Sequence, residues 1–534
     1  MIDARSLPDN HTLETDICIV GAGVAGITLA RELVSANFRV CLLESGGLEP
    51  DRNTQSLYWG ENIGQPYYSL DTCRGRLFGG TSHYWIIPLG EGKKGVRLRP
   101  LDPIDFEQRD WVPYSGWPFD KTHLDPFYER AQSVCRIGPF RYDAKFWSDP
   151  AKTPELPLSQ ENVKTSVFQF GERDCFYTDY RNEIDQARNI STYIYANAVE
   201  IETADTPNTV SRLHIACLGG KKLSVTAKIY VLAMGAIEIP RLLLLSNRTL
   251  NTGLANQNDL VGRFFMEHPH LWSGIYMPAS PEVFRSVGLY RIHRVANVPI
   301  MGKLAITEDA MRNGKLLNWC ASIHPSRRGA PSKGVESLKS IISEFKKGRL
   351  PDELLHHLLA ATQDIRGIST KVLALLGKQN KDMAFRLNHM AEQTPNPDSR
   401  ITLSAEPDEL GQRRVNLDWR LTALDMQSMV KSQEIVDQEL RRAGLGRLHI
   451  EQTGDRPPQD IHGGWHHMGT TRMHVNPGQG VVDANSKVHG ISNLYVAGPS
   501  VFPTGGCSNP VLTIVALTIR LADHLKNQML KPGF

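Results

Sequence analysis

The chain has 534 residues, of which 41% are hydrophobic and 22% are charged, and its formal net charge is +3. This length exceeds what a single hydrophobic core supports and predicts two or three domains. The charge is close to balanced and no long run of Lys and Arg is present, which argues against nucleic-acid binding. The polar N-terminus lacks the pattern of a secretory signal, and no stretch of about 18 apolar residues predicts a membrane span.

The eight cysteines form no CxxC pair and no cluster with metal-ligand spacing, so we expect no metal site. Cys18 and Cys41 lie within apolar runs that are typical of buried strands. Free thiols fit a reducing compartment better than a disulfide framework does. We therefore expect a cytoplasmic protein.

Residues 16–47 have the pattern of strand, glycine-rich turn, helix and strand. Ile17 to Val20 is a short β-branched run that predicts a buried parallel strand. Helical spacing follows the turn, and Val40 to Glu44 predicts a second strand that ends in an acid. This order predicts a βαβ nucleotide-binding unit.

The turn in this unit carries GxGxxG at Gly21, Gly23 and Gly26. In such a motif the first glycine makes the tight turn and the second lets the backbone approach a pyrophosphate. The third allows close helix–strand packing. Glu44 stands where an acid meets the ribose hydroxyls. The segment therefore predicts a dinucleotide site and by itself leaves FAD and NAD open.

Two glycine-containing segments follow in the middle of the chain. RGRLFGGTSHYW, residues 74–85, has the composition of a loop that lies against a flat ring system, although an ordinary surface loop is the alternative. VLAMGAIEIPRLLLLS, residues 231–246, predicts a buried strand, a turn and a helix. That strand would join the nucleotide-binding sheet.

From about Leu271 the pattern changes to alternating strands. LWSGIYM, LLNWCASI, AFRLNHMAEQ and RVNLDW predict an antiparallel sheet in a second lobe. Residues 334–378 are amphipathic at helical spacing and predict a helical cap over that sheet. A partner or membrane contact through the Lys-rich face of this segment is the alternative.

These motifs resemble those of the glucose–methanol–choline (GMC) oxidoreductases. The resemblance rests on the N-terminal GAGVAG with Glu44, on GGTS at 79–82 and GAIEIPRLLLLS, on EQTPNPDSRITLS at 392–404, on HHMGTTRM, and on the C-terminal NLYVAGPSVFPTGGCSNPVLTIVALTIRLADHL. They span nearly the whole chain in the family's order. The GTTRM and PTGG patterns look most like the pyranose-oxidase-like and bacterial sugar-oxidising branch.

The resemblance implies an α/β fold with a Rossmann-like FAD-binding domain and an α+β substrate domain. It implies that residues 1–270 and 456–534 form the FAD-binding domain and that residues 271–455 form the substrate domain. No second GxGxxG is present, so the substrate itself must reduce the flavin, which argues against an NADPH-dependent monooxygenase. The cofactor-binding residues that follow are Gly21, Gly23, Gly26, Glu44, Arg76, Gly79, Gly80, Thr81, Ser82, Val199, Ala233, Gly235, Gly498, Asn509, Pro510 and Thr513.

The catalytic residues that the resemblance implies are His466 and Asn509. Oxidation of a CH–OH group removes a proton from the oxygen and a hydride from the carbon, and a group with a pKa near 7 suits the proton. In the family motif HxxGT the first His is this base, which is His466 here, and His467 would point into packing. Asn509 would bind the substrate oxygen beside His466, unless it only caps the helix predicted at 511–526.

The resemblance also implies noncovalent FAD, because the position that carries a linking His in some members is Tyr84 here, one residue after His83. The expected substrate is a small alcohol or sugar, with O2, a quinone or a carrier protein as the electron acceptor. A lyase or light-driven decarboxylase of the same fold is the alternative, and a flavin-binding protein without chemistry is a further one. Retention of both His466 and Asn509 favours the oxidoreductase.

Overall fold

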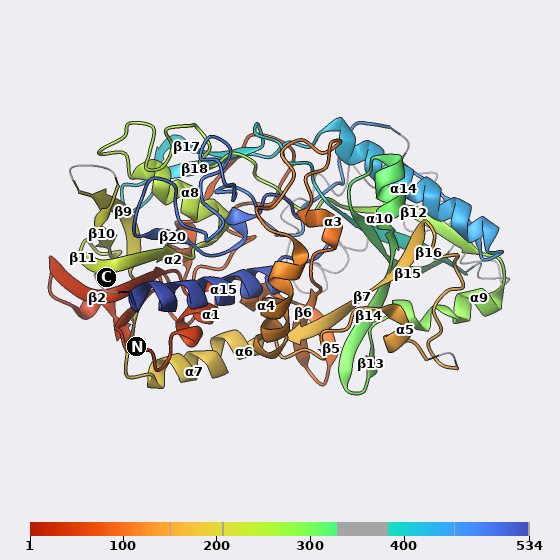
Figure 1. The fold of residues 1–534 in the computed structure, drawn as a ribbon, viewed down its shortest axis with the longest axis horizontal. Coiled ribbons are helices and arrows are strands. Elements are labelled where there is room, and N and C mark those ends of the chain that lie inside the picture. The colour runs from red at the N-terminus through yellow and green to blue at the C-terminus, as the bar shows by residue number, and fades with distance from the viewer. Residues whose placement is uncertain (150, 205–207, 328–382, 453, 532–534) are drawn as a thin grey trace, which may run out of the picture.

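The structure is a computed structural model that describes residues 1–149, 151–204, 208–327, 383–452 and 454–531. Within these residues the chain has a mixed α/β architecture with two large sheets and one small sheet, as Figure 1 shows. The helical cap predicted at 334–378 lies outside the described residues.

The first large sheet contains the strands that the sequence assigned to nucleotide binding. Its order is β1-β8-β3-β2-β11-β10-β9, and β20 also pairs with β11. Neighbouring strands among β1, β8, β3, β2 and β11 pair in parallel, and β20 also pairs in parallel with β11. β10 pairs antiparallel with both β11 and β9. The bounds are β1 (Ile2–Asp3), β2 (His11–Val20), β3 (Val40–Leu43), β8 (Ile190–Ile194), β9 (Asn197–Thr203), β10 (Val210–Ala216), β11 (Lys222–Leu232) and β20 (Leu494–Val496).

The expected strands occupy the centre of this sheet. Ile17 of β2 lies between Val40 of β3 and Ile229 of β11, and the three strands are almost fully buried at their C-terminal ends. Near-continuous β-branched and aliphatic runs suit strands that are covered on both faces. The carboxyl ends of β2 and β11 lead into α1 (Val24–Glu32) and α8 (Gly235–Leu245).

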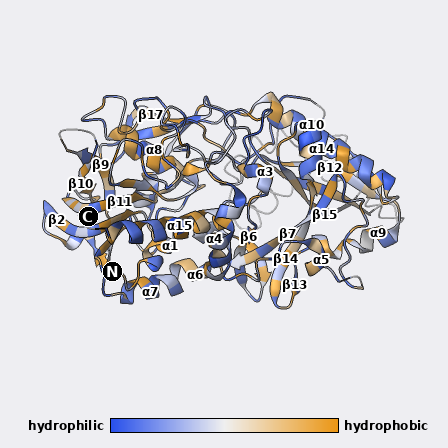
Figure 2. Cartoon of the chain, viewed as in Figure 1, coloured by the Kyte–Doolittle hydropathy of each residue, from blue (hydrophilic) through white to orange (hydrophobic). Residues whose placement is uncertain are grey.

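The C-terminal segment returns to this first sheet. β20 pairs with β11, and α15 (Val511–Met529) packs against α1 and α4 (Lys121–Val134). Figure 2 shows much of α15 as hydrophobic, in keeping with its largely buried sequence. The N-terminus of α15 is thereby fixed close to the βαβ turn.

The second large sheet has the order β19-β12-β16-β15-β14-β7-β6-β5, with β13 on β14, and its neighbouring strands pair antiparallel. Strands from residues 87–172 thus pair with strands that come after residue 270, and the three-part domain division stays a prediction. The bounds are β5 (Ile87–Gly90), β6 (Lys93–Leu98), β7 (Val163–Glu172), β12 (His270–Pro278), β13 (His293–Val295), β14 (Val298–Ile306), β15 (Trp319–Arg327), β16 (Met383–Ala391) and β19 (Gly446–His449).

The expectation for RVNLDW was wrong in one respect. This segment is a strand, β18 (Arg413–Asp418), but it belongs to a separate sheet with β17 (Arg400–Pro407) and β4 (Gly60–Asn62). Alternation predicts a strand with one buried face and carries no information about which sheet edge it joins.

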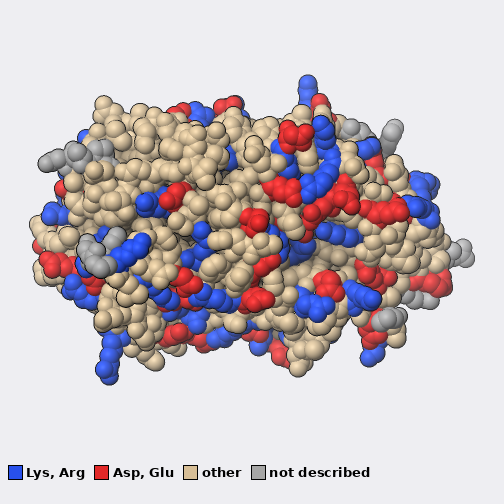
Figure 3. Space-filling view, in the orientation of Figure 1, with Lys and Arg blue, Asp and Glu red and all other residues tan. Residues whose placement is uncertain are grey.

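The remaining helices lie mainly around the edges of these sheets (Figure 1). Their bounds are α2 (Arg52–Ser56), α3 (Pro103–Phe106), α5 (Ala144–Trp147), α6 (Asp174–Tyr177), α7 (Asp179–Gln186), α9 (Pro281–Arg285), α10 (Glu308–Gly314), α14 (Ala423–Arg442) and the 3-10 turns η1 (Ala4–Ser6), η2 (Gly80–Tyr84), η3 (Val287–Tyr290) and η4 (Pro499–Val501). The described helices include none with the length and apolar character that crossing a membrane requires. Figure 3 shows acidic and basic side chains interspersed over the visible face.

Candidate active site

A cavity of about 470 Å³ brings together residues from both large sheets and from the returning C-terminal segment. Most residues predicted for the site line it. These are Gly21, Gly23, Glu44, Arg76, Gly80, Thr81, Ser82, Val199, Ala233, Gly235, His466, Gly498, Asn509 and Pro510. Sequence positions as far apart as 21 and 510 therefore share one cavity.

Three predicted residues do not line the cavity. A Cβ at Gly26 would lie 1.8 Å from the carbonyl oxygen of Gly21, so this glycine allows α1 to pack closely against the turn. Gly79 has a φ of +97°, which glycine adopts without strain, and it precedes η2. The hydroxyl of Thr513 lies 2.8 Å from the Tyr128 hydroxyl in the core instead.

The βαβ turn presents a helix N-terminus to the cavity. Gly21 has a φ of +103°, and a Cβ there would lie 2.9 Å from the carbonyl oxygen of Ala233. Gly23 precedes α1 without a side-chain cap, and no atom lies within 4 Å of the place its Cβ would take. The first amides of α1 thus face an open space, which is the arrangement that binds a phosphate.

Glu44 closes the end of β3 beside this turn. Its carboxylate accepts hydrogen bonds from the amides of Ala22, at 2.9 Å, and Gly46, at 2.8 Å. Burial raises the pKa of Glu44, although these two amides oppose the shift. Oε1 also accepts from the Ser45 hydroxyl at 3.2 Å, whereas Oε2 has a single donor and can accept a further bond. Glu44 lines the cavity and is thus able to accept a hydrogen bond from a ligand hydroxyl there.

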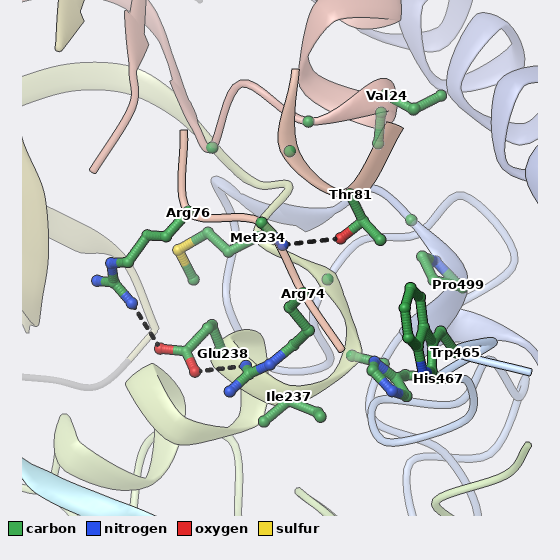
Figure 4. Close-up of a pocket in the computed structure, with 18 of the residues that line it drawn as sticks. Val24, Arg74, Arg76, Thr81, Met234, Ile237, Glu238, Trp465, His467 and Pro499 are labelled. Carbon is green, nitrogen blue, oxygen red and sulfur yellow. Dashed lines mark hydrogen bonds and ion pairs between the residues drawn. The ribbon is translucent and has the colours of Figure 1, made fainter. Parts of the chain in front are cut away.

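A buried ion cluster forms another part of the cavity lining, and Figure 4 shows Glu238 in it with Arg74 and Arg76. Glu238 accepts from Arg74 at 2.7 Å, from Arg76 at 3.4 Å and from Arg241 at 3.2 Å. Burial opposes ionisation of Glu238, but the three guanidinium groups lower its pKa to about 2. The Nε of Arg76 is buried without an acceptor, so this side chain retains a free donor.

The imidazole of His466 lies between two side chains from distant parts of the chain. Its Nδ1 is 2.8 Å from Nδ1 of His268, and its Nε2 is 2.9 Å from Nδ2 of Asn509. Asn509 does not cap α15, since Pro510 occupies the N-cap position. Burial, followed by the charges of His268, His270 and Arg97, holds the pKa of His466 well below its usual value near 6.5.

A backbone carbonyl fixes the direction of this hydrogen-bond chain. The carbonyl of Gly505 only accepts, and Nε2 of His268 lies 3.2 Å from it, so this nitrogen carries the hydrogen. Burial lowers the pKa of His268 to about 4, and the neutral ring then has a bare Nδ1 that accepts from Nδ1–H of His466. His466 is left with a lone pair on Nε2, toward which Asn509 directs its amide N–H.

Glu267 holds the backbone around these histidines. Its Oε2 accepts from the amides of His268, at 3.1 Å, and of Gly464 and His466, both at 3.0 Å. Burial raises the pKa of Glu267 to about 7, although these bonds and the one from Tyr67 oppose the shift. One buried carboxyl therefore positions both histidines of the His268–His466 pair.

His467 points in another direction from His466, as alternation along an extended segment predicts. Its Nε2 lies 2.8 Å from the Tyr67 hydroxyl and 3.6 Å from Glu267, and its ring packs near Phe265. Figure 4 shows it beside Trp465 at the edge of the cavity. The Nε2 atom of His467 thus contacts Tyr67, whereas the Nε2 atom of His466 contacts Asn509.

Part of the chain matches a known protein family. A family model described as GMC oxidoreductase matches residues 395–518, which include His466 and Asn509. Residues 395–518 thus match the C-terminal domain of the GMC oxidoreductases. The chain is 24% identical to the fructose dehydrogenase large subunit of Gluconobacter japonicus, across 97% of this chain and 99% of that protein. It is also 24% identical to paromamine 6'-oxidase of Streptomyces fradiae, across 96% and 92%.

The fold is also that of solved structures. A formate oxidase of Aspergillus oryzae RIB40, studied for modification of its FAD, aligns with a TM-score of 0.53 at 17% identity, across 98% of this chain and 99% of that one. Together these matches agree with the family resemblance read from the motifs and make the protein an oxidoreductase.

The match to the GMC family implies FAD, and the residues of the cavity fit it. The open space over Gly23, the amides of α1 and the free Nε of Arg76 suit the phosphates of a dinucleotide. At the other end, Oδ1 of Asn509 is buried without a partner, so a further polar group can bind it. In the part of the chain that is described, no group of three or more His, Cys, Asp or Glu side chains is arranged to hold a metal.

Several residues of this candidate site were not predicted from the sequence. His268 and His270 flank Pro269, and this His-Pro-His pattern is the one signal that could have marked them. Arg97, His462 and Trp465 also line the cavity, and no motif distinguishes them. Trp465 has a φ of +62°, which is unusual for a bulky residue and marks a strained backbone next to His466.

Proposed function

We propose that this protein oxidises a CH–OH group of a small hydroxylated substrate, a sugar or another alcohol. One observation carries the proposal: Nε2 of His466 is a bare acceptor on the cavity, held so by His268 and met by Asn509. The names of the relatives, a fructose dehydrogenase and a paromamine oxidase, support a sugar or related alcohol.

In this proposal the residues act on the proton of the substrate hydroxyl. The substrate hydroxyl replaces Asn509 as the donor to Nε2 of His466, and the amide of Asn509 then donates to the substrate oxygen. Nε2 of His466 accepts the hydroxyl proton. The Nδ1–H of the resulting imidazolium keeps its acceptor on His268. FAD, when bound, supplies the acceptor for the hydride that leaves the substrate carbon.

The low pKa of His466 suits a base that must be unprotonated before the substrate binds. The N-terminus of α15 adds positive potential beside Asn509 and favours negative charge in this part of the cavity. Glu267, by holding the amide of His466, keeps the ring in place during the proton transfer.

We further propose that FAD is bound noncovalently. His83 does not line the cavity; its Nε2 lies 2.9 Å from the carbonyl of Phe78, and its ring stacks on Tyr177 with the centroids 3.8 Å apart. The eight cysteines are free and buried, which supports the cytoplasmic location expected from the sequence.

Anaerobic addition of a panel of sugars and alcohols in the dark, with the flavin absorbance followed, tests the function. We expect at least one compound to bleach the flavin. If dithionite bleaches it and no compound does, the proposal fails, and turnover that requires light would point to a decarboxylase. Repeating the panel with O2 and with a dye acceptor separates an oxidase from a dehydrogenase that uses a quinone or a carrier protein.

A further inference from the structure

Four arginines line the cavity within the described residues, and one differs from the other three. Arg74, Arg76 and Arg241 all bind Glu238, at 2.7, 3.4 and 3.2 Å. Arg97 on β6 makes no side-chain hydrogen bond or ion pair with any described residue, and its Nε is buried without an acceptor. The residue is partly buried, so its side chain is available to a group that enters the cavity. A guanidinium without an acceptor there is able to bind an anion.

Arg97 differs from the nearby buried cation Lys303 in having no hydrogen-bond acceptor for its Nε. Lys303 is wholly buried, and its Nζ lies 3.6 Å from Sγ of Cys320. Burial opposes ionisation of Cys320, but its hydrogen bond with Cys507 and the charges of Lys303 and Arg97 lower its pKa to about 6. Lys303 thus donates to Cys320, whereas the Nε of Arg97 has no acceptor among the described residues and its side chain lines the cavity.

His270 adds a second unpartnered polar group at the same end of the cavity. Its side chain is 6% exposed, lines the cavity and has a buried Nε2 with no partner. A Cβ at Gly464 would lie 2.7 Å from this Nε2 and 2.9 Å from Cε1 of His466. The absence of that Cβ leaves room between the two imidazoles. A substrate group there would lie next to the proposed base.

We propose that Arg97 and His270 form a subsite for a carboxylate on the substrate, so that the preferred substrate is a hydroxy acid rather than a neutral sugar or alcohol. This inference rests on the proposed function, because His466 defines where the reacting CH–OH lies. A planar guanidinium binds a carboxylate through two parallel N–H···O bonds. A single uncompensated guanidinium matches a monoanion, whereas a phosphate dianion would leave one charge unpaired in the cavity.

The subsite is tested first by binding, without turnover. The FAD-loaded protein is titrated with acetate and with acetamide, and the heat of binding is followed by calorimetry. We expect acetate to bind more tightly, and Arg97→Gln to weaken acetate binding by roughly tenfold to a hundredfold, as the loss of charged hydrogen bonds predicts. Arg97→Lys should retain part of the affinity.

A control variant removes the same charge outside the cavity. Arg294 is exposed on β13 and donates to the carbonyls of Leu89 and Asn297. Arg294→Gln should bind acetate as the wild type does. Equal binding of acetate and acetamide, or an Arg97→Gln variant that binds acetate normally, would overturn the subsite. Tighter binding of inorganic phosphate than of acetate would overturn its assignment to a carboxylate.

A second measurement separates this inference from the proposed function. Anaerobic flavin reduction by gluconate is compared with reduction by gluconamide, which has the same hydroxyls and no charge. We expect Arg97→Gln to raise KM for the acid with little change for the amide. If gluconamide and gluconate reduce the flavin equally well, the subsite fails and the proposed function stands. If no compound reduces the flavin while acetate binding still depends on Arg97, the proposed function fails and the subsite stands.

Discussion

The Nδ1 atoms of His268 and His466 lie 2.8 Å apart, although 198 residues separate them in the chain. The carbonyl of Gly505 beyond His268 makes this contact directional, because it obliges Nε2 of His268 to donate and Nδ1 to accept. The tautomer of His466 is therefore set by a residue that does not itself face the substrate oxygen. His268 is in this account a positioning residue for the base.

Replacement of His268 by Leu should slow flavin reduction by roughly tenfold to a hundredfold, because Nδ1–H of His466 would be left as an unsatisfied buried donor. His268→Asn offers a carbonyl oxygen near the position of the lost Nδ1 and should recover much of the rate. Stopped-flow reduction across pH, with FAD content measured for each variant, is the check. Equal rates for the Leu and Asn variants would show that His268 serves packing alone.

The acid limb of kcat/KM should lie at unusually low pH for an enzyme with a histidine base. Burial and nearby positive charges lower the pKa of His466 well below its usual value near 6.5, so the neutral, active form persists as pH falls through that value. We expect a plateau that extends below pH 6.5 before activity declines. A limb centred at or above 6.5 would contradict the electrostatic description of the site.

Asn509→Asp should move the acid limb of the kcat/KM profile to higher pH. A carboxylate 2.9 Å from Nε2 of His466 would stabilise the imidazolium and raise the pKa of the base, so that less of the active neutral form is present at a given pH. The variant should fold and keep FAD, since Asn509 does not cap α15. Its rate of reduction should fall, with the optimum moved to higher pH. An unchanged rate and pH profile would remove Asn509 from the catalytic site.

Acid precipitation of the protein should release all of the flavin into the supernatant. The motivation is the position of His83, which contacts the Phe78 carbonyl and Tyr177 and does not line the cavity. Colour that remains with the precipitate would contradict noncovalent binding. His83→Ala is the variant that would then identify or exclude the linkage.

The sequence predicted the parts of the site that are local in the chain. GxGxxG with Glu44 encodes its own turn, helix and strand, and the structure has β2, α1 and β3 there. The family resemblance, through HxxGT and the residue before Pro510, selected His466 and Asn509, and their side chains lie 2.9 Å apart. Such motifs are readable because a short stretch determines their geometry.

The remainder of the site depends on contacts between distant segments. His268 meets His466 only because the backbone at Met266 pairs with Met468. Arg97 reaches the cavity because β6 joins the second sheet through β7, and strand alternation does not specify which strands pair. For the same reason RVNLDW was expected in the larger sheet and lies in the small one.

The most direct test of the account is the rate of anaerobic flavin reduction in His466→Ala compared with His467→Ala and the wild type. Both variants should bind FAD, and the substrate is one that bleaches the wild-type flavin. Loss of the base should slow reduction by roughly a hundredfold to ten-thousandfold in His466→Ala. His467→Ala, which loses its contact with Tyr67, should be affected far less. A His466→Ala variant that reduces at the wild-type rate, or a larger loss in His467→Ala, would contradict the assignment of the base.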